Sequence, residues 1–513
     1  MRLSRVLWLA GPLLGGIAAL LQGQDANWDL RVYHYYNPYA FLAGRLNVDI
    51  IPALNPTFYN PLLDLPVYFA AQALPARLVG FLLGAFQGLI VPLLVALGLR
   101  LLPGGVGFRQ AIALVLALVG ATGAMTLVQF GATFHDNTLA VPVLAALLLV
   151  LRAQAQAERN EPVDLSIATA ALLSGLAFGL KLTMAIYVAG FAAALLAALP
   201  PRLWLRAVLV AGIAGLAGTL LTGGWWSWHL WQEFANPFFP HFNDLFRSDM
   251  AGPVDFRDRK FLEKLDLVDR IVFPFLFTFD SWKAAEGDFR DPRLLLAFLA
   301  ALPALALCWR AEAKARAVVV FAAVAYVLWV LVYGIYRYLL PLEMLAPVIV
   351  LAALRCLRLD RSIAARAAAA LSLLAAALTL YPDFPDPMRA PWTERFVQLD
   401  APPRIAQPER TLVLLPGDRP TAFMIPEFPP AIRFVHVSDW PYLYQSADKG
   451  YEPIVRKLLA EHDGALLALF GPQDEARTPR VLERFGLRLT ADCQPVKANL
   501  VPWPFRLCRV EKS

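Results

Sequence analysis

Long apolar runs separated by short polar connections recur over residues 6–381 of the chain. Each run approaches the length that an α-helix needs to cross a bilayer, so the pattern predicts an all-α polytopic membrane region with about eleven transmembrane helices, to within about two. The predicted spans are residues 6–22, 78–99, 110–127, 138–151, 165–180, 183–199, 207–223, 294–309, 317–334, 339–354 and 367–381.

Three polar segments are too long to be simple connections between spans. Two of them, residues 23–77 and 224–293, interrupt the membrane region, and the third is everything after Tyr381. A proline-rich stretch follows Tyr381, and prolines end helices. We therefore expect a transmembrane module over residues 1–381 and a separate domain over residues 382–513.

The C-terminal segment has the pattern of a soluble α/β domain. Apolar runs at 411–416, 432–437 and 465–470 are bounded by turn residues and are strand-like. The stretches 453–462 and 475–485 have helical periodicity. Alternating strands and helices are typical of a small α/β fold.

Composition and charge support the membrane interpretation and predict its sidedness. The chain is 58% hydrophobic and only 17% charged, which excludes an ordinary soluble protein. With the N-terminus inside, the short outer connections carry only Lys181 and Arg337. The predicted cytoplasmic segments carry the rest of this positive charge, at Arg2, Arg5, Arg100, Arg109, Arg152, Arg159, Arg202, Arg206, Arg310, Lys314, Arg316, Arg355, Arg358, Arg361 and Arg366. This asymmetry follows the positive-inside rule.

The net charge of +6 therefore reports topology rather than nucleic-acid binding. We expect a multi-pass protein of a bacterial inner membrane with a cytoplasmic N-terminus and a periplasmic C-terminal domain. The first apolar run lacks a small-residue cleavage site, which indicates a retained anchor.

The cysteines agree with this sidedness. Cys308 and Cys356 lie in or at the end of predicted spans, whereas Cys493 and Cys508 lie in the predicted outer domain. A pair of cysteines in an oxidising compartment favours a disulfide, so we predict a Cys493–Cys508 bridge.

A polar, aromatic segment just after the first span contains the first candidate chemistry. In a helix, Tyr33 and Tyr36 would share a face with Asp29, because positions i+4 and i+7 align. The Asp29 carboxylate is a candidate general base for an acceptor hydroxyl, and Asp25 is a weaker one. Tyr33, His34 and Tyr36 are candidates for binding a sugar. The alternative is a helix cap or a solvated loop.

The remaining candidates lie at the predicted outer ends of later spans. Asp136 is a second catalytic candidate, and together with Asp29 it could bind Mg²⁺ or Mn²⁺, which prefer oxygen ligands. Lys181, Arg337 and the adjacent Tyr338 are candidates for binding a lipid-linked phosphate. The alternatives are turn chemistry for Asp136 and snorkelling for the two cations. Glu343 is expected to neutralise Arg337.

The order and sidedness of these motifs resemble the GT-C superfamily of integral-membrane glycosyltransferases. The resemblance rests on Trp28–His34, Asp136, Gly179–Lys181, Asn236–Pro240 and Arg337–Pro341. It implies a polyprenyl-phosphate sugar donor, Asp29 as the catalytic base, and Lys181 and Arg337 facing the donor phosphate. Within the superfamily, the chain is most similar to the bacterial branch that transfers hexoses such as mannose. Leu30 stands where many relatives have a second acid, which puts metal dependence in doubt.

The sequence thus predicts a GT-C-like hexosyltransferase with a C-terminal α/β domain. It would move a sugar from a lipid phosphate to the hydroxyl of a glycan, lipid or protein acceptor, with inversion and with no nucleic-acid partner. One alternative is a lipid-linked oligosaccharide polymerase or ligase. Another is a lipid flippase or transporter, which should instead carry charges near the bilayer midplane.

Overall fold

The chain forms two compact units in a computed structural model that describes residues 2–401, 403–438 and 449–513. Unit 1 comprises Met1–Leu21, Phe81–Trp225 and Asp258–Pro385. Unit 2 comprises Gln22–Gly80, Trp226–Arg257 and Asp386–Ser513. The side chains of Arg2 and Arg5 lie outside the described part.

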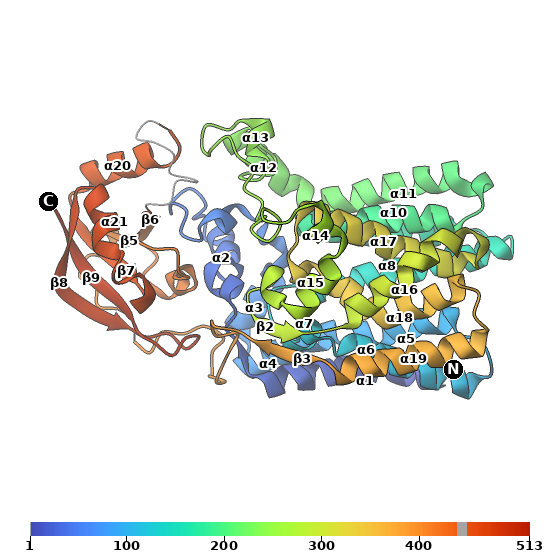
Figure 1. The fold of residues 1–513 in the computed structure, drawn as a ribbon. Helices are drawn as coiled ribbons and strands as arrows, with labels where there is room; N and C mark the ends of the chain where they lie inside the picture. The colour runs from blue at the N-terminus through green and yellow to red at the C-terminus, as the bar shows by residue number, and fades with distance from the viewer. Residues whose placement is uncertain (1, 402, 439–448) are drawn as a thin grey trace. The chain divides into compact units, whose positions relative to one another are not determined.

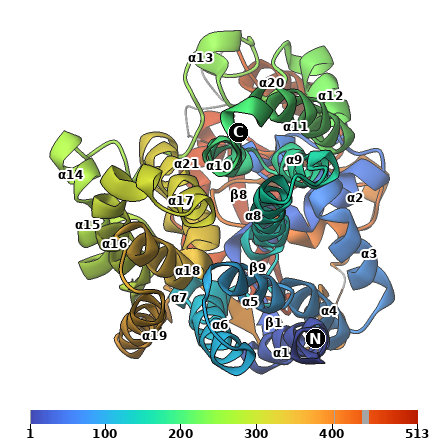
Figure 2. The same ribbon diagram turned by 90° about the vertical axis from the view of Figure 1, so that its right-hand side faces the viewer.

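Unit 1 is a bundle of apolar helices around α18, Leu340–Cys356, almost all of whose residues are buried. Seen along the bundle, α18 has neighbours on all sides, among them α5, α6, α16 and α17 (Figure 2). The longer helices of the unit are α1 (Arg2–Gln22), α4 (Ala76–Gln87, shared with unit 2), α5 (Ile90–Leu101), α6 (Val106–Ala121), α8 (Asp136–Glu158), α9 (Asp164–Leu180), α10 (Ala185–Ala198), α11 (Trp204–Thr219), α16 (Arg293–Leu307), α17 (Ala313–Val332), α18 and α19 (Arg361–Ala377).

The described chain contains helices that are long and apolar enough to cross a membrane, as a multi-pass membrane protein requires. Six helical stretches meet both criteria: Ala76–Leu101, Asp136–Glu158, Pro201–Phe234, Arg293–Arg310, Ala313–Val332 and Tyr336–Cys356. Four shorter apolar helices are Val6–Gln22, Val106–Ala121, Asp164–Leu180 and Leu182–Ala198. The count of eleven spans stays a prediction.

The last predicted span, 367–381, differs from the structure at its end. Helix α19 stops at Ala377, and Leu380–Asp383 form strand β3, which pairs antiparallel with β2 (Asp288–Arg290). The length of an apolar run cannot predict this strand, because β3 depends on pairing with the distant residues 288–290.

Glycines let α1 and α4 approach closely within unit 1. A Cβ atom on Gly15 would lie 2.3 Å from the carbonyl oxygen of Gly84, and one on Gly88 would lie 2.3 Å from that of Gly11. Gly11 and Gly15 in α1 therefore face Gly84 in α4 and Gly88 directly after it. Two glycines four residues apart on each side are the small-residue spacing that allows membrane helices to pack backbone against backbone.

Unit 2 contains a five-stranded sheet with the order β6-β5-β7-β9-β8 (Figure 1). Its strands are β5 (Thr411–Leu415), β6 (Arg433–His436), β7 (Ala465–Phe470), β8 (Leu487–Val496) and β9 (Phe505–Lys512). Strand β5 is parallel to β6 and β7, whereas β9 runs antiparallel to β7 and β8. Helices α20 (Glu452–Glu461) and α21 (Thr478–Arg484) follow β6 and β7. The three predicted strands and two predicted helices agree with β5, β6, β7, α20 and α21.

The first outer segment belongs to the same unit as this sheet and shares its hydrophobic core. Strand β1 (Gln24–Asp25) pairs with β4 (Arg389–Ala390), and Ile50 forms a parallel bridge with Val435 at the β6 edge. One core cluster includes Tyr35 and Tyr36 together with Phe396, Val413 and Phe434. Residues 24–80 are therefore held by packing and are not a loose loop.

Candidate functional site

The segment that contains the candidate base Asp29 begins with a turn that Asp25 and Asn27 stabilise by hydrogen bonds. Oδ1 of Asp25 accepts hydrogen bonds from the backbone N and from Nδ2 of Asn27, at 3.2 and 2.8 Å. Oδ1 of Asn27 accepts from the backbone N of Leu30 at 2.9 Å. Asp25 is 1% exposed, so it has a structural task at the start of the helical turn.

Asp29 directly precedes a π-helical turn, Leu30–His34, which leads into α2, Tyr36–Leu42. Its Oδ2 lies 3.4 Å from the hydroxyl of Tyr33, so the expected i+4 contact is present. The i+7 contact is replaced, because Tyr36 donates its hydroxyl to Oδ2 of Asp49 at 2.9 Å. A π turn has a wider period than an α turn, which changes the direction of the residues that follow. Burial and the nearby Asp49 carboxylate raise the pKa of Tyr36, which keeps that hydroxyl protonated as a donor.

Arg31 is a buried cation that sequence reasoning did not select. Its Nε donates to the carbonyl of Ala26 at 2.8 Å, and its NH2 group donates to Asp386 at 2.5 Å. Burial lowers the pKa of Arg31, and the Asp386 carboxylate opposes that effect. This ion pair ties the candidate base segment to the beginning of the C-terminal part of unit 2.

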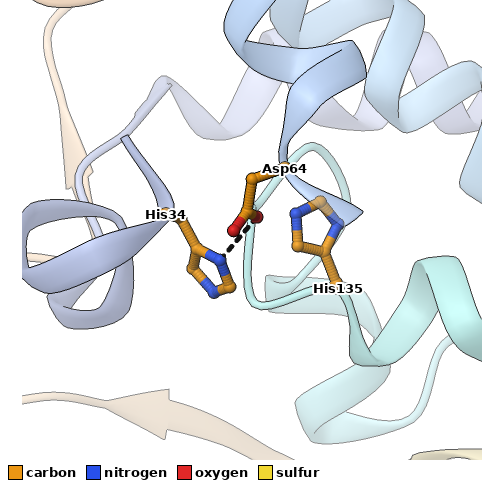
Figure 3. Close-up of side chains that lie close together, drawn as sticks. All are labelled: His34, Asp64 and His135. Carbon is orange, nitrogen blue, oxygen red and sulfur yellow. Dashed lines mark hydrogen bonds and ion pairs between the residues drawn. The ribbon is translucent and has the colours of Figure 1, made fainter. Parts of the chain in front are cut away.

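His34 is oriented by a carboxylate that sequence reasoning also missed. Nδ1 of His34 lies 2.7 Å from Oδ1 of Asp64, and both side chains are buried (Figure 3). A carboxylate at one ring nitrogen orients the imidazole and raises the basicity of the other nitrogen, whether it acts as a base or as a metal ligand. The signal was a lone acid inside the apolar stretch 61–69, a position where a carboxylate is costly unless it is paired.

Unit 1 brings Asp136 and Lys181 together at the N-terminus of α8. Nζ of Lys181 lies 2.5 Å from Oδ1 of Asp136 and 3.0 Å from the carbonyl oxygen of Phe134. Asp136 is 1% exposed, whereas the Lys181 side chain retains 15% exposure. The apolar stretch 165–199 forms two helices rather than one: α9 ends at Leu180 and α10 begins at Ala185. Lys181 lies in the break between them.

Arg337 and Tyr338 lie beside this ion pair. The Arg337 guanidinium is 4.8 Å from the ring centre of Phe134 and 5.3 Å from that of Tyr338, and Nζ of Lys181 is 5.5 Å from the same tyrosine ring. The hydroxyl of Tyr187 donates to the carbonyl of Tyr338 at 2.6 Å. The four predicted residues Asp136, Lys181, Arg337 and Tyr338 thus form one cationic and aromatic cluster.

Glu343 does not neutralise Arg337. Its Oε1 accepts from the backbone N and the hydroxyl of Thr126, at 2.8 and 2.7 Å, and its Oε2 accepts from the hydroxyl of Tyr336 at 2.8 Å. The carboxylate is fully buried. It holds the short helix α7, Ala124–Val128, against the turn that carries Arg337.

The predicted metal ligands belong to different units, Asp29 to unit 2 and Asp136 to unit 1. Carboxylates are suitable ligands for Mg²⁺ or Mn²⁺. In unit 1 the Asp136 carboxylate already has a cationic partner in Lys181. The divalent cation stays a prediction.

Cys493 and Cys508 are joined by a disulfide in the structure. They face each other across the antiparallel pair β8 and β9. The other two cysteines, Cys308 and Cys356, are buried and free. The bridge links the last two strands of the chain.

Comparison with known proteins identifies a shared fold at low sequence identity. The chain is similar to the crystal structure of ArnT from Cupriavidus metallidurans bound to undecaprenyl phosphate, with a TM-score of 0.50. The similarity covers 98% of this chain and 97% of that chain at 14% identity. No family model matches the chain, and no curated protein matches it. The structural likeness thus extends over both units and shows the fold alone.

Proposed function

We propose that the protein is a membrane glycosyltransferase that moves a hexose from a polyprenyl-phosphate donor to an acceptor hydroxyl. The observation that carries the proposal is the fold shared over 98% of the chain with a protein solved bound to undecaprenyl phosphate. The resemblance of the sequence to the GT-C superfamily is consistent with that fold. The acceptor is a glycan, lipid or protein at the outer face of the membrane.

Asp29 is the general base in this proposal. Its carboxylate takes the proton of the acceptor hydroxyl as the oxygen attacks the anomeric carbon. The bond from that carbon to the phosphate oxygen breaks, and the electron pair leaves with the polyprenyl phosphate. A single displacement without a protein nucleophile inverts the anomeric configuration. Tyr33, His34 and Tyr36 belong to the same buried segment and would position the sugar.

Lys181 and Arg337 supply positive charge for the donor phosphate. Preorganised cations stabilise the negative charge that develops on a leaving phosphate. Lys181 is held by Asp136, and Arg337 lies against the rings of Phe134 and Tyr338, so both heads are positioned before a ligand arrives. A divalent cation on Asp29 or Asp136 would supply further charge for the same phosphate.

The sidedness follows the positive charges. We place the N-terminus in the cytoplasm and residues 382–513 in the periplasm of a bacterial cell. In intact cells, a membrane-impermeant thiol reagent should label a cysteine introduced at the exposed Glu409 and spare one introduced at Arg361. The reverse labelling would overturn the topology.

The function is tested with purified protein and a panel of polyprenyl-phosphate hexoses. Release of free polyprenyl phosphate, together with sugar transfer to an added acceptor, would support the glycosyltransferase. Transfer only of preassembled oligosaccharides would favour a polymerase or ligase. Movement of the intact donor across proteoliposomes without cleavage would favour a flippase.

A further inference from the structure

Unit 2 contains a cavity of about 340 Å³ that none of the candidate roles above uses. Its walls come from three separate parts of the chain: residues within 46–58, residues within 226–250, and the three side chains of Arg433, Tyr451 and Ile454. All of these residues belong to unit 2. The volume lies within the roughly 300–1,000 Å³ of small-molecule sites.

Aromatic side chains form much of the cavity wall, and they are fixed by contacts among themselves. The ring of Phe58 lies 5.2 Å from that of Phe234 and 6.2 Å from that of Tyr451, centre to centre. Trp226 donates its indole N–H to the carbonyl of Phe58 at 2.9 Å. The faces of aromatic rings carry partial negative charge, so they attract the polarised C–H groups on the face of a sugar ring.

The polar side chains of the cavity are mixed in sign. Glu233 contributes an exposed carboxylate from α12, Trp225–Phe234, and Arg433 contributes a guanidinium whose Nε donates to the carbonyl of Val48. Asn47 adds an amide with both donors and acceptors. An anion would be repelled by the carboxylate and a cation by the guanidinium. Hydroxyl groups, which both donate and accept, match this set.

One wall of the cavity is bonded to the segment that contains Asp29. Asp49 lines the cavity, and its carboxylate is saturated by Arg45 at 2.6 and 2.7 Å and by the hydroxyl of Tyr36 at 2.9 Å. Tyr36 begins the helix directly after the π turn that Asp29 precedes. A sugar in the cavity would therefore be held by a wall in direct contact with the candidate catalytic segment.

We propose that this cavity is a saccharide-binding site and that it holds a sugar ring of the acceptor. Saccharide binding rests on the cavity itself, whereas the assignment to the acceptor rests on the proposed function. The acceptor is then a glycan or a glycolipid, with neutral hydroxyl-rich rings next to the reacting hydroxyl.

The test measures binding of methyl glycosides of glucose, mannose, galactose and N-acetylglucosamine to the purified full-length protein without donor. Saturation-transfer NMR should detect at least one glycoside, with transfer from aromatic protons. Loss of one charge-assisted hydrogen bond should weaken that binding by about tenfold or more in Glu233→Ala and Arg433→Met. Gln232→Ala, which removes an exposed neighbour of Glu233 that does not line the cavity, should bind like the wild type.

Binding of none of these glycosides, or equal binding by both cavity variants and the wild type, would overturn the proposal. Displacement of the glycoside by a single-chain lipid with no sugar would also overturn it, because the cavity would then be an acyl site. The two proposals fail separately. Glycoside binding without any cleavage of the donor would contradict the proposed transferase activity but would still support the saccharide-binding site. The acceptor assignment would be wrong if no glycoside inhibited sugar transfer and if the Glu233→Ala variant kept the wild-type KM for the acceptor.

Discussion

The ammonium of Lys181 lies 2.5 Å from the carboxylate of Asp136, and the aspartate is buried. Removing one member of a buried pair leaves an uncompensated charge, which typically costs about 3–5 kcal/mol. We expect Lys181→Met and Asp136→Asn each to lower the free energy of unfolding, and the double variant to lower it by less than their sum. Thermal unfolding in detergent, arranged as a double-mutant cycle, measures the coupling. Additive effects would show that the two residues are energetically independent.

Arg337 provides the sharpest test of the phosphate-binding role. Its guanidinium lies against two rings, Phe134 and Tyr338, so it is positioned for a phosphate at its edge. Arg337→Ala should weaken donor binding, and Arg337→Lys should recover only part of it, because an ammonium lacks the planar two-pronged geometry. Equilibrium binding of a fluorescent polyprenyl phosphate measures this. Unchanged affinity in both variants would favour the snorkelling interpretation.

We expect Glu343 to stabilise the fold through its hydrogen bonds to Thr126 and Tyr336 rather than through its negative charge. In Glu343→Gln the amide oxygen can still accept from Thr126, and the amide N–H₂ can donate to the oxygen of Tyr336. Glu343→Ala leaves the buried N–H of Thr126 unpaired, at a cost of about 1–3 kcal/mol. We therefore expect the alanine variant to be clearly less stable than the glutamine variant in thermal unfolding. Equal destabilisation of both variants relative to the wild type would mean that the negative charge itself is required.

His241 predicts how the stability of unit 2 depends on pH. Burial lowers the pKa of His241 from 6.5 to about 4, and Asp255 only partly opposes this. Between these two values the unfolded chain binds a proton that the folded chain does not. The free energy of unfolding should therefore rise with pH through this window and keep that contribution above it. Melting temperatures from pH 4 to 7 should show a smaller slope in His241→Gln than in the wild type. Identical slopes would exclude His241 as a source.

Local patterns in the sequence predicted the local structure well. The apolar runs mark the helices of unit 1, and the runs at 411–416, 432–437 and 465–470 mark β5, β6 and β7. Of the candidate site residues, Asp29 lies buried in the aromatic segment after the first span, and Lys181, Arg337 and Tyr338 lie together in unit 1. These features depend on periodicity, charge and residue type within short windows.

Contacts between residues far apart in the sequence could not be predicted from these short stretches. The side chain of Gln24 donates to the carbonyl of Phe396 across 372 residues, and Arg31 reaches Asp386 across 355. These bonds join the first outer segment to the part of unit 2 that precedes the C-terminal sheet. The His34–Asp64 pair and the π turn were missed for the same reason, since each depends on tertiary packing rather than on local propensity.

The most direct test of the account measures transfer of the sugar by wild-type protein and by Asp29→Asn from the same polyprenyl-phosphate hexose. Loss of a general base typically slows a reaction by about 10²–10⁴-fold. We predict that the wild type transfers the hexose to the acceptor and releases polyprenyl phosphate. Asp29→Asn should be slower by that factor while it binds the donor with wild-type affinity, and Asp25→Asn, at a residue that holds the preceding turn, should lose less. Wild-type turnover by Asp29→Asn, or no transfer from any polyprenyl-phosphate hexose by the wild type, would contradict the account.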